Sequence, residues 1–221
     1  MLLACSQFNE SWPWKRDLAM TADRLEQARL GIVHELGELK GSDDVYAQET
    51  EIVYRIERNV MSGTFAVRRL IGMPSKVTKK TRATKAVVTR FPLRDGAKAP
   101  DLWDALGNLD MYDTDTPQDV TISVNALCNL FVHSLILRLA WEFDDIPSSD
   151  NSSPYEPDLQ RNETPTKLTG LLVASDKSSA KHLTFVKVTE LVRIFRIFAN
   201  DEVTRLVGRR DRHGRMHMTA L

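Results

Sequence analysis

Three polar residues, Asn125, Asn129 and His133, have the spacing in this chain that best fits chemistry. They stand four residues apart, so they share one ridge of an otherwise apolar helix expected over residues 120–134. Histidine is the usual proton-transfer group near neutral pH, and His133 would reach solvent at the helix end. Buried polar groups need partners or water, because leaving them unsatisfied is costly. The ridge is therefore either the wall of a catalytic cleft or a set of structural hydrogen bonds.

The run Asn129-Leu-Phe-Val-His133 resembles the end of the Arg-Asn-x3-His form of the Arg-x4–6-His motif of HEPN domains. HEPN domains are helical-bundle proteins, and many are metal-independent ribonucleases of toxin and defence systems. The resemblance covers residues 20–136 as a pattern of helices and residues 128–133 as a motif. It implies that His133 is the catalytic histidine and that Asn129 is its polar neighbour.

Cys128 stands where the family motif has its arginine. An arginine there would bind the scissile phosphate and stabilise the charge of the transition state, which a cysteine cannot do. The resemblance therefore implies either an inactive protein or an arginine supplied by the second helix. The candidates for this substrate-binding role are Arg55, Arg58, Arg68 and Arg69.

For an active protein, the resemblance implies attack of an RNA 2′-hydroxyl on the adjacent phosphate. His133 would act as general base or acid, with no metal and no cofactor. Members of the family commonly bring two motifs together, so a homodimer is also implied. The alternative is a non-catalytic module that holds a protein or a nucleic acid, and the sequence leaves open whether the chain is an enzyme.

No other motif indicates catalysis or a bound metal. The glycines stand in no nucleotide-binding spacing, and the aspartates of residues 110–119 lack the glycine and the terminal glutamate of an EF-hand. Cys5 and Cys128 are too few for a zinc framework and favour a reducing compartment, so we expect a cytoplasmic protein. No apolar run reaches the roughly 18 residues of a membrane helix, so no membrane association is expected.

Hydrophobic periodicity predicts the helices that would position these residues. Apolar residues recur at spacings of three and four from Thr21 to a helix end near Gly41, and again from Asp43 to Gly72. Two long helices joined by a short polar turn predict an antiparallel helix hairpin.

The apolar period changes to two after His133. Residues 135–143, 168–175 and 182–188 are β-like runs, which predict a small antiparallel sheet, and Thr189 begins a final helix. We therefore expect an α+β fold that is mostly α. It is a helical bundle with a long antiparallel helix hairpin and a small three-stranded antiparallel sheet before a C-terminal helix.

A single globular domain is expected over residues 20–204. Residues 1–19, with Trp12-Pro-Trp14 in a polar setting, are predicted to be a loosely attached extension. Residues 144–166 are rich in serine, proline and acidic side chains and predict a mobile loop. Residues 205–221 are predicted to be a flexible basic tail.

Equal numbers of basic and acidic residues, 30 of each, hide opposed blocks of charge. Residues 76–98 carry a net charge of +7, residues 99–119 carry −6, and residues 205–221 carry +4. The blocks are either solvated loops whose opposite charges meet one another or a basic surface for phosphates. On the second interpretation, residues 76–98 and 205–215 would contact RNA or an acidic partner.

Overall fold

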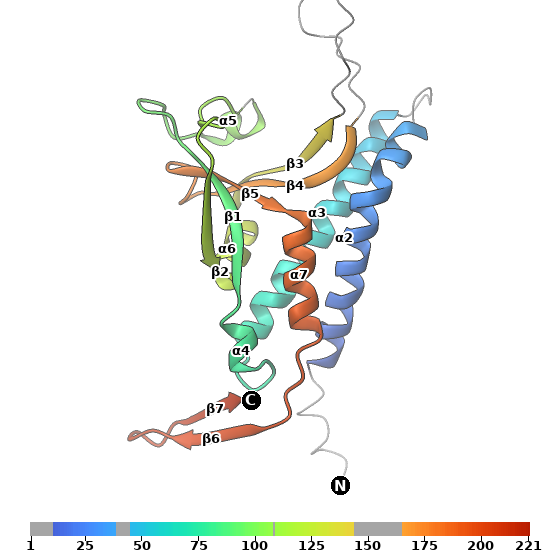
Figure 1. The fold of residues 1–221 in the computed structure, drawn as a ribbon. Helices are drawn as coiled ribbons and strands as arrows, with labels where there is room; N and C mark the ends of the chain where they lie inside the picture. The colour runs from blue at the N-terminus through green and yellow to red at the C-terminus, as the bar shows by residue number, and fades with distance from the viewer. Residues whose placement is uncertain (1–10, 39–44, 108, 144–164) are drawn as a thin grey trace, which may run out of the picture.

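The computed structural model describes residues 11–38, 45–107, 109–143 and 165–221. Its helices are α2 (Trp12–Glu38), α3 (Val45–Ile71), α4 (Lys79–Arg82), α5 (Leu102–Leu106), α6 (Val124–Val132) and α7 (Val188–Ala199). Its strands are β1 (Lys85–Pro92), β2 (Gln118–Ser123), β3 (Ser134–Phe143), β4 (Pro165–Ser175), β5 (His182–Lys187), β6 (Leu206–Arg210) and β7 (Met216–Ala220). Figure 1 shows α2, α3 and α7 on one side of a twisted sheet, with β6 and β7 projecting from one end of the molecule.

Five strands form one antiparallel sheet in the order β2-β1-β5-β4-β3. The pairing of β1 with β5 joins the β1–β2 pair to the three later strands. Phe185 of β5 lies at this junction, opposite Thr89 of β1 on one side and Leu172 of β4 on the other. Strands β1 and β5, which are distant in the sequence, are therefore paired at the centre of the sheet.

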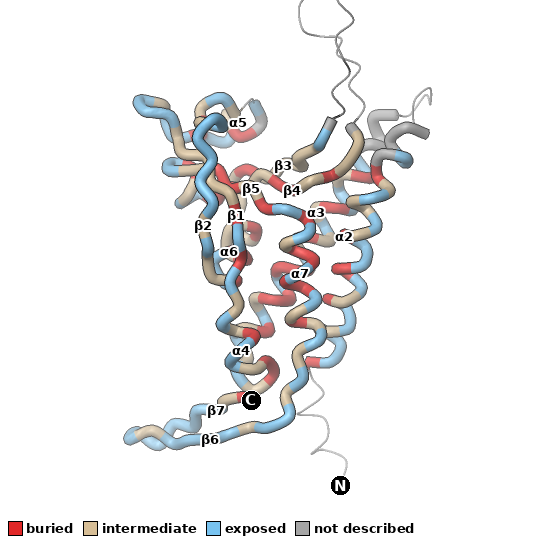
Figure 2. The backbone as a smooth tube through the Cα atoms, in the orientation of Figure 1, coloured by how far each residue is buried: buried red, intermediate tan, exposed pale blue. Residues whose placement is uncertain are grey.

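The larger hydrophobic core lies between this sheet and helices α2, α3, α6 and α7 (Figure 2). Leu171 and Val173 of β4 point into it, because alternate residues of a strand face the same side. The helices α2 and α3 pack antiparallel, since Trp14 contacts Phe65 near one end, with ring centroids 6.2 Å apart. This layer makes the helices and the sheet one folding unit.

A smaller core covers part of the opposite sheet face. Here the connection between β1 and β2, which contains α5, packs on Ile136, Ala174 and Leu183. Tyr112 of this connection is fully buried, and its hydroxyl donates a 2.8 Å hydrogen bond to the carbonyl of Ser179. Burial raises the pKa of Tyr112 to about 12, so the phenol stays protonated. The aspartate-rich connection is thus anchored to the sheet.

The predicted fold class is wrong, because the chain is not mostly α and its main sheet is not a small three-stranded one. The three expected strands are present as β3, β4 and β5, but the sheet has two more, β1 and β2. Strand β1 falls in the basic block of residues 76–98, where loops or a phosphate-binding surface were expected, and β2 overlaps the start of the helix expected over residues 120–134. Charged residues mask the alternation of β1, in which Ala86 and Val88 are buried while Lys85 and Val87 are exposed. The β2 edge strand is too short for its period to be separated from the helix that follows it.

Both predicted chain ends also need correction. Helix α2 begins at Trp12, before the predicted start near Met20, and Leu18 is fully buried, so residues 12–19 belong to the first helix. The predicted basic tail contains the paired strands β6 and β7. Residues 1–10, the predicted helix end at Gly41 and residues 144–164 lie outside the described residues. Among those described, no helix has the length and apolar character needed to span a membrane.

Candidate nucleic-acid interface

Of the three residues of the polar ridge, Asn125 and His133 are exposed and Asn129 is half-buried. Helix α6 ends at Val132, and His133 is its exposed C-cap residue, whose backbone N–H donates to the carbonyl of Asn129 at 3.1 Å. Asn129 Oδ1 is thus the one buried atom of the ridge without a partner among the described residues, and both interpretations of the ridge stay predictions.

The four candidate arginines are spread along α3. Arg55 pairs with Glu35 of α2, and Arg58 lines a groove between α2 and α3. Arg68 lies thirteen residues after Arg55, about 20 Å along the helix, so the two cannot share one phosphate. Among the described residues, no hydrogen bond or ion pair joins His133 to an arginine. Arg69 is exposed near the end of α3.

Cys128, at the position of the family's arginine, is a packing residue of α6. It is 1% exposed, and burial raises the pKa of its thiol to about 12, against the weaker opposing effect of the Arg68 charge. The thiol is therefore protonated and shielded from substrate. Among the residues that the structure describes, no three His, Cys, Asp or Glu side chains gather as metal ligands.

The structure divides the first basic block between the two ends of the molecule. Lys98 approaches Asp101 at 3.7 Å, and Arg94 donates to the carbonyl of Tyr112 beside the acidic aspartates. Asp119 accepts a 2.7 Å hydrogen bond from Thr89. Lys98 and Asp101 thus meet as the first interpretation of the charge blocks predicted, whereas Arg94 and Asp119 contact uncharged groups.

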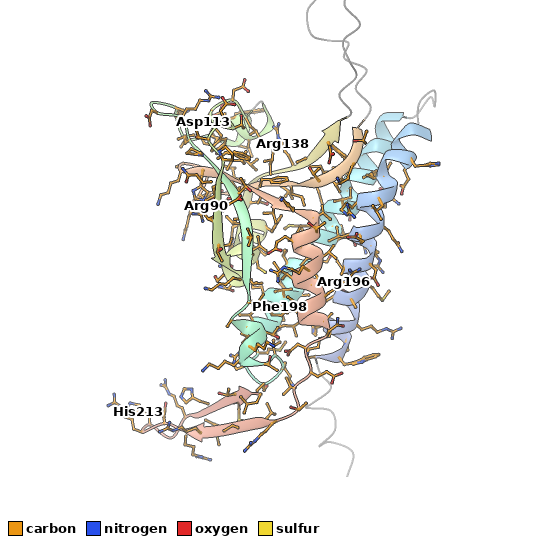
Figure 3. All side chains as sticks on the ribbon, viewed as in Figure 1. Arg90, Asp113, Arg138, Arg196, Phe198 and His213 are labelled. Carbon is orange, nitrogen blue, oxygen red and sulfur yellow. The ribbon has the colours of Figure 1, made fainter. Side chains whose placement is uncertain are left out.

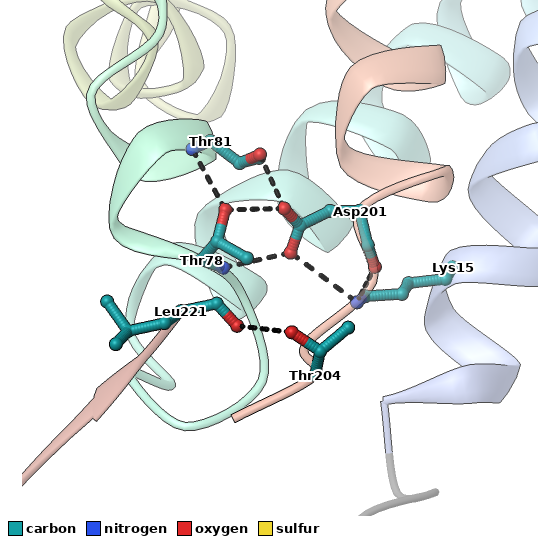
Figure 4. A network of polar contacts seen from close by, with 6 residues as sticks. All are labelled: Lys15, Thr78, Thr81, Asp201, Thr204 and Leu221. Atoms are coloured by element: carbon teal, nitrogen blue, oxygen red, sulfur yellow. Dashed lines mark hydrogen bonds and ion pairs between the residues drawn. The ribbon is translucent and has the colours of Figure 1, made fainter. Parts of the chain in front are cut away.

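The other half of the block lies on α4, beside the base of the β6–β7 hairpin. Asp201 makes this connection, because its carboxylate accepts hydrogen bonds from Thr78 N (2.9 Å), Thr78 Oγ1 (2.6 Å) and Thr81 Oγ1 (2.6 Å; Figure 4). The ammonium of Lys15 lies 3.7 Å from Asp201 Oδ2. Lys79 and Lys80 of α4 are exposed at this end.

Burial acts to raise the pKa of Asp201. The hydrogen bonds from Thr78 and Thr81 and the charge of Lys15 outweigh that effect, so the pKa of Asp201 is lowered. The carboxylate is therefore ionised at neutral pH, and it fixes α2, α4 and the start of the hairpin to one another.

We call the β6–β7 hairpin, Leu206–Ala220, the ribbon. Its strands pair in register from Leu206 opposite Ala220 to Arg210 opposite Met216. Asp211 organises the turn, because its Oδ1 accepts hydrogen bonds from the backbone N–H groups of His213 (2.8 Å) and Arg215 (2.9 Å). Gly214 has φ +75°, the left-handed conformation that a three-residue hairpin loop needs.

The ribbon concentrates exposed positive charge. Five arginines lie on it or at its base, and all five are exposed: Arg205, Arg209, Arg210, Arg212 and Arg215. Among the described residues, only the guanidinium of Arg212 has a partner, the ring of neighbouring His213. Figure 3 shows the side chains around His213 at the tip, away from the body of the molecule. Four guanidinium groups are therefore available to a ligand.

One face of the ribbon carries two methionines together with Arg210, which lies directly opposite Met216. Met216 and Met218 lie on the same face as Gly208, and the sulfur of each would be 3.1 Å from a Cβ placed on that glycine. Arg209 and His217 are directly opposite each other on the other face. Exposed arginines and flexible methionines thus share one projecting element.

Sequence reasoning placed basic residues at the C-terminus but missed the strands that present them. A signal was available in Asp211-Arg-His-Gly214, since an aspartate and a glycine at this spacing are typical of a hairpin turn. The flanking strands carry too many arginines to show a hydrophobic alternation.

Comparisons with protein-family models, with curated proteins and with solved structures find no match to this chain. Its function is therefore inferred from the placement of its own charged and apolar side chains.

Proposed function

We propose that this protein binds a double-stranded nucleic acid, without cutting it, through the ribbon and the adjoining α4. The observation that carries the proposal is the set of four exposed guanidinium groups, on the ribbon and at its base, that have no partner among the described residues. Arginine presents several N–H donors in a planar fork that matches phosphate oxygens. Contacts of this kind to backbone phosphates release counterions and supply most non-specific affinity.

The shape of the ribbon supports the same proposal. A two-stranded antiparallel ribbon fits the major groove of a duplex, and several groups of DNA-binding proteins use strands in this way. Lys79 and Lys80 of α4 lie at the base of the ribbon, where they extend the positive surface toward the flanking phosphates. The ribbon and α4 thus form a narrow basic projection on the packed helices and sheet.

RNA cleavage by His133 is less well supported. Within the part of the chain that the structure describes, the side chain of His133 has no arginine partner to hold a phosphate, and Cys128 occupies the motif position where the family has one. We expect the protein to leave single- and double-stranded RNA intact in EDTA, as judged on a denaturing gel. Cleavage that disappears in His133→Ala would instead establish the HEPN-like activity.

The binding proposal is tested by fluorescence anisotropy with a labelled DNA duplex, an RNA duplex of the same sequence and a single strand. We expect duplex binding by the wild type and at least about tenfold weaker binding by Arg209→Ala/Arg210→Ala. The slope of log K against log salt should fall by about 1 for each arginine removed.

The matched control is Lys177→Ala/Lys181→Ala, which removes the same charge from two exposed sites between β4 and β5. It should bind as the wild type does. Equal weakening in the control and in the ribbon variant would mean that general charge, and not the ribbon, binds the duplex. No binding by the wild type at low salt would overturn the proposal.

A further inference from the structure

The end of the molecule opposite the ribbon presents an exposed apolar pair. Leu102 of α5 is 65% exposed and Trp103 is 80% exposed. Their backbone is well held, because Asp101 and Asp104 form a capping box at the start of α5. Large apolar side chains exposed together on an ordered element mark an interaction site more often than a solvated surface.

The surroundings of this pair are acidic. The carboxylates near α5 in the sequence are Asp101, Asp104, Asp110, Asp113 and Asp115. Hydrogen bonds from the backbone of Asp104 and from Thr116 are the largest effects that lower the pKa values of Asp101 and Asp113. We call α5 with these five aspartates the acidic end. A partner for it must offer positive charge around an apolar, adaptable surface.

The ribbon of a second copy offers both features. Met216 is 53% exposed and Met218 is 38% exposed, and they lie among the ribbon arginines. Methionine sulfur makes favourable contacts with aromatic rings, and the flexible methionine side chain adapts to a protruding ring such as that of Trp103. Guanidinium groups pair with carboxylates in the bidentate geometry that they also use for phosphates.

We propose that the acidic end of one copy, centred on Leu102 and Trp103, docks on the methionine face of the ribbon of a second copy. Figure 1 places α5 and the ribbon at opposite ends of the molecule, so the acidic end and the ribbon of one chain do not contact each other. The contact joins two different surfaces and is heterologous. It therefore leaves a free acidic end and a free ribbon, and it builds open chains or a ring. This arrangement differs from a symmetric dimer formed around His133.

Sedimentation velocity over a range of protein concentrations tests the proposal. The wild type should form concentration-dependent oligomers that high salt weakens, because screening acts on the exposed charges. Trp103→Ser and, separately, Arg209→Glu/Arg210→Glu should each weaken self-association at least about tenfold. Leu30→Ser is the matched control, since Leu30 is 65% exposed on α2, and it should associate as the wild type does.

Mixing the two variants provides the decisive measurement. Trp103→Ser retains its ribbon and Arg209→Glu/Arg210→Glu retains its acidic end, so their mixture should form a one-to-one dimer that grows no further. A wild type that stays monomeric at every concentration overturns the proposal. It is also overturned if the ribbon variant still associates with itself, because that result would show contact between two acidic ends.

The proposal does not rest on nucleic-acid binding, and the two can fail separately. Trp103→Ser changes no residue of the ribbon and should bind the labelled duplex with wild-type affinity. Its melting temperature should also match that of the wild type, because the side chain is almost entirely solvated. A Trp103→Ser variant that melts earlier and loses duplex binding would show that α5 supports the fold instead of a partner.

Discussion

At the residue scale, one carboxylate joins three segments that are far apart in sequence. Asp201 accepts three hydrogen bonds from Thr78 and Thr81 and pairs with Lys15 of α2. Lys15 also donates to the backbone carbonyl of Asp201. These contacts fix the direction in which the chain leaves α7 toward the ribbon. A local polar junction therefore sets the position of the element to which we assign binding.

Asp201→Ala should lower the free energy of unfolding by about 2–4 kcal/mol, as measured by urea denaturation. The substitution leaves the hydroxyls of Thr78 and Thr81 and the half-buried ammonium of Lys15 without their acceptor. Glu202→Ala, at the exposed neighbouring position, is the control and should change stability by less than about 0.5 kcal/mol.

The pH dependence of this effect has a definite sign. The pKa of Asp201 is lower in the folded protein than in the unfolded chain, so its stabilisation is complete above the unfolded value of about 4. It is lost as the pH falls through the folded pKa. The stability difference between wild type and Asp201→Ala should therefore shrink in acid, and a difference that is constant with pH would contradict this account.

At the element scale, α3 and α7 approach each other at a glycine. A Cβ on Gly63 would lie 2.2 Å from Cε2 of Phe195, which is itself 1% exposed. The absence of a side chain at this position lets the aromatic ring pack against the backbone of α3. Helix propensity alone would favour alanine there, so tertiary packing accounts for the glycine.

Gly63→Ala should destabilise the protein by about 1–3 kcal/mol through overpacking, as measured by chemical denaturation. Gly31→Ala in α2 is the matched control, because no atom lies within 4 Å of its added Cβ. That change should stabilise the protein by up to about 1 kcal/mol through helix propensity. Equal effects at the two positions would show that the contact with Phe195 is not tight.

The elements that the sequence predicted are those with a long or regular apolar period. The helix pair α2 and α3 and the strands β3, β4 and β5 have that property, and so does α7. Strands β1 and β2 lack it, because half of each strand faces solvent and carries charged or polar side chains. Their place depends on pairing with each other and with β5, a long-range contact that no local pattern encodes.

Across the whole molecule, the zero net charge of the chain hides two ends with opposite charge. Because β1 is an extended strand of eight residues, it spans about 26 Å and separates the two halves of the first basic block. Lys79 and Lys80 lie with the ribbon, whereas Arg94 and Lys98 lie among the aspartates near α5. A chain with no net charge thus has a basic end and an acidic end.

Nucleic acid and the acidic end of a second copy should compete, because both are assigned to the same arginines. Adding a saturating DNA duplex should dissociate the oligomers into protein–duplex complexes, as followed by sedimentation with a labelled duplex. Duplex added to Trp103→Ser should bind without any such dissociation step. Oligomers that bind the duplex and keep their size would show that the two contacts use different surfaces.

The sequence by itself determined the amphipathic helices, three of the strands, the polar ridge ending at His133 and the blocks of charge. These properties depend on local composition and period, which the chain carries wherever it folds. The tertiary structure was needed to show that His133 makes no hydrogen bond or ion pair with the described arginines, that Cys128 is buried in the core and that the C-terminal arginines lie on a paired ribbon. Those outcomes depend on strand pairing and helix packing between distant segments, so the location of the candidate site was decided by long-range contacts.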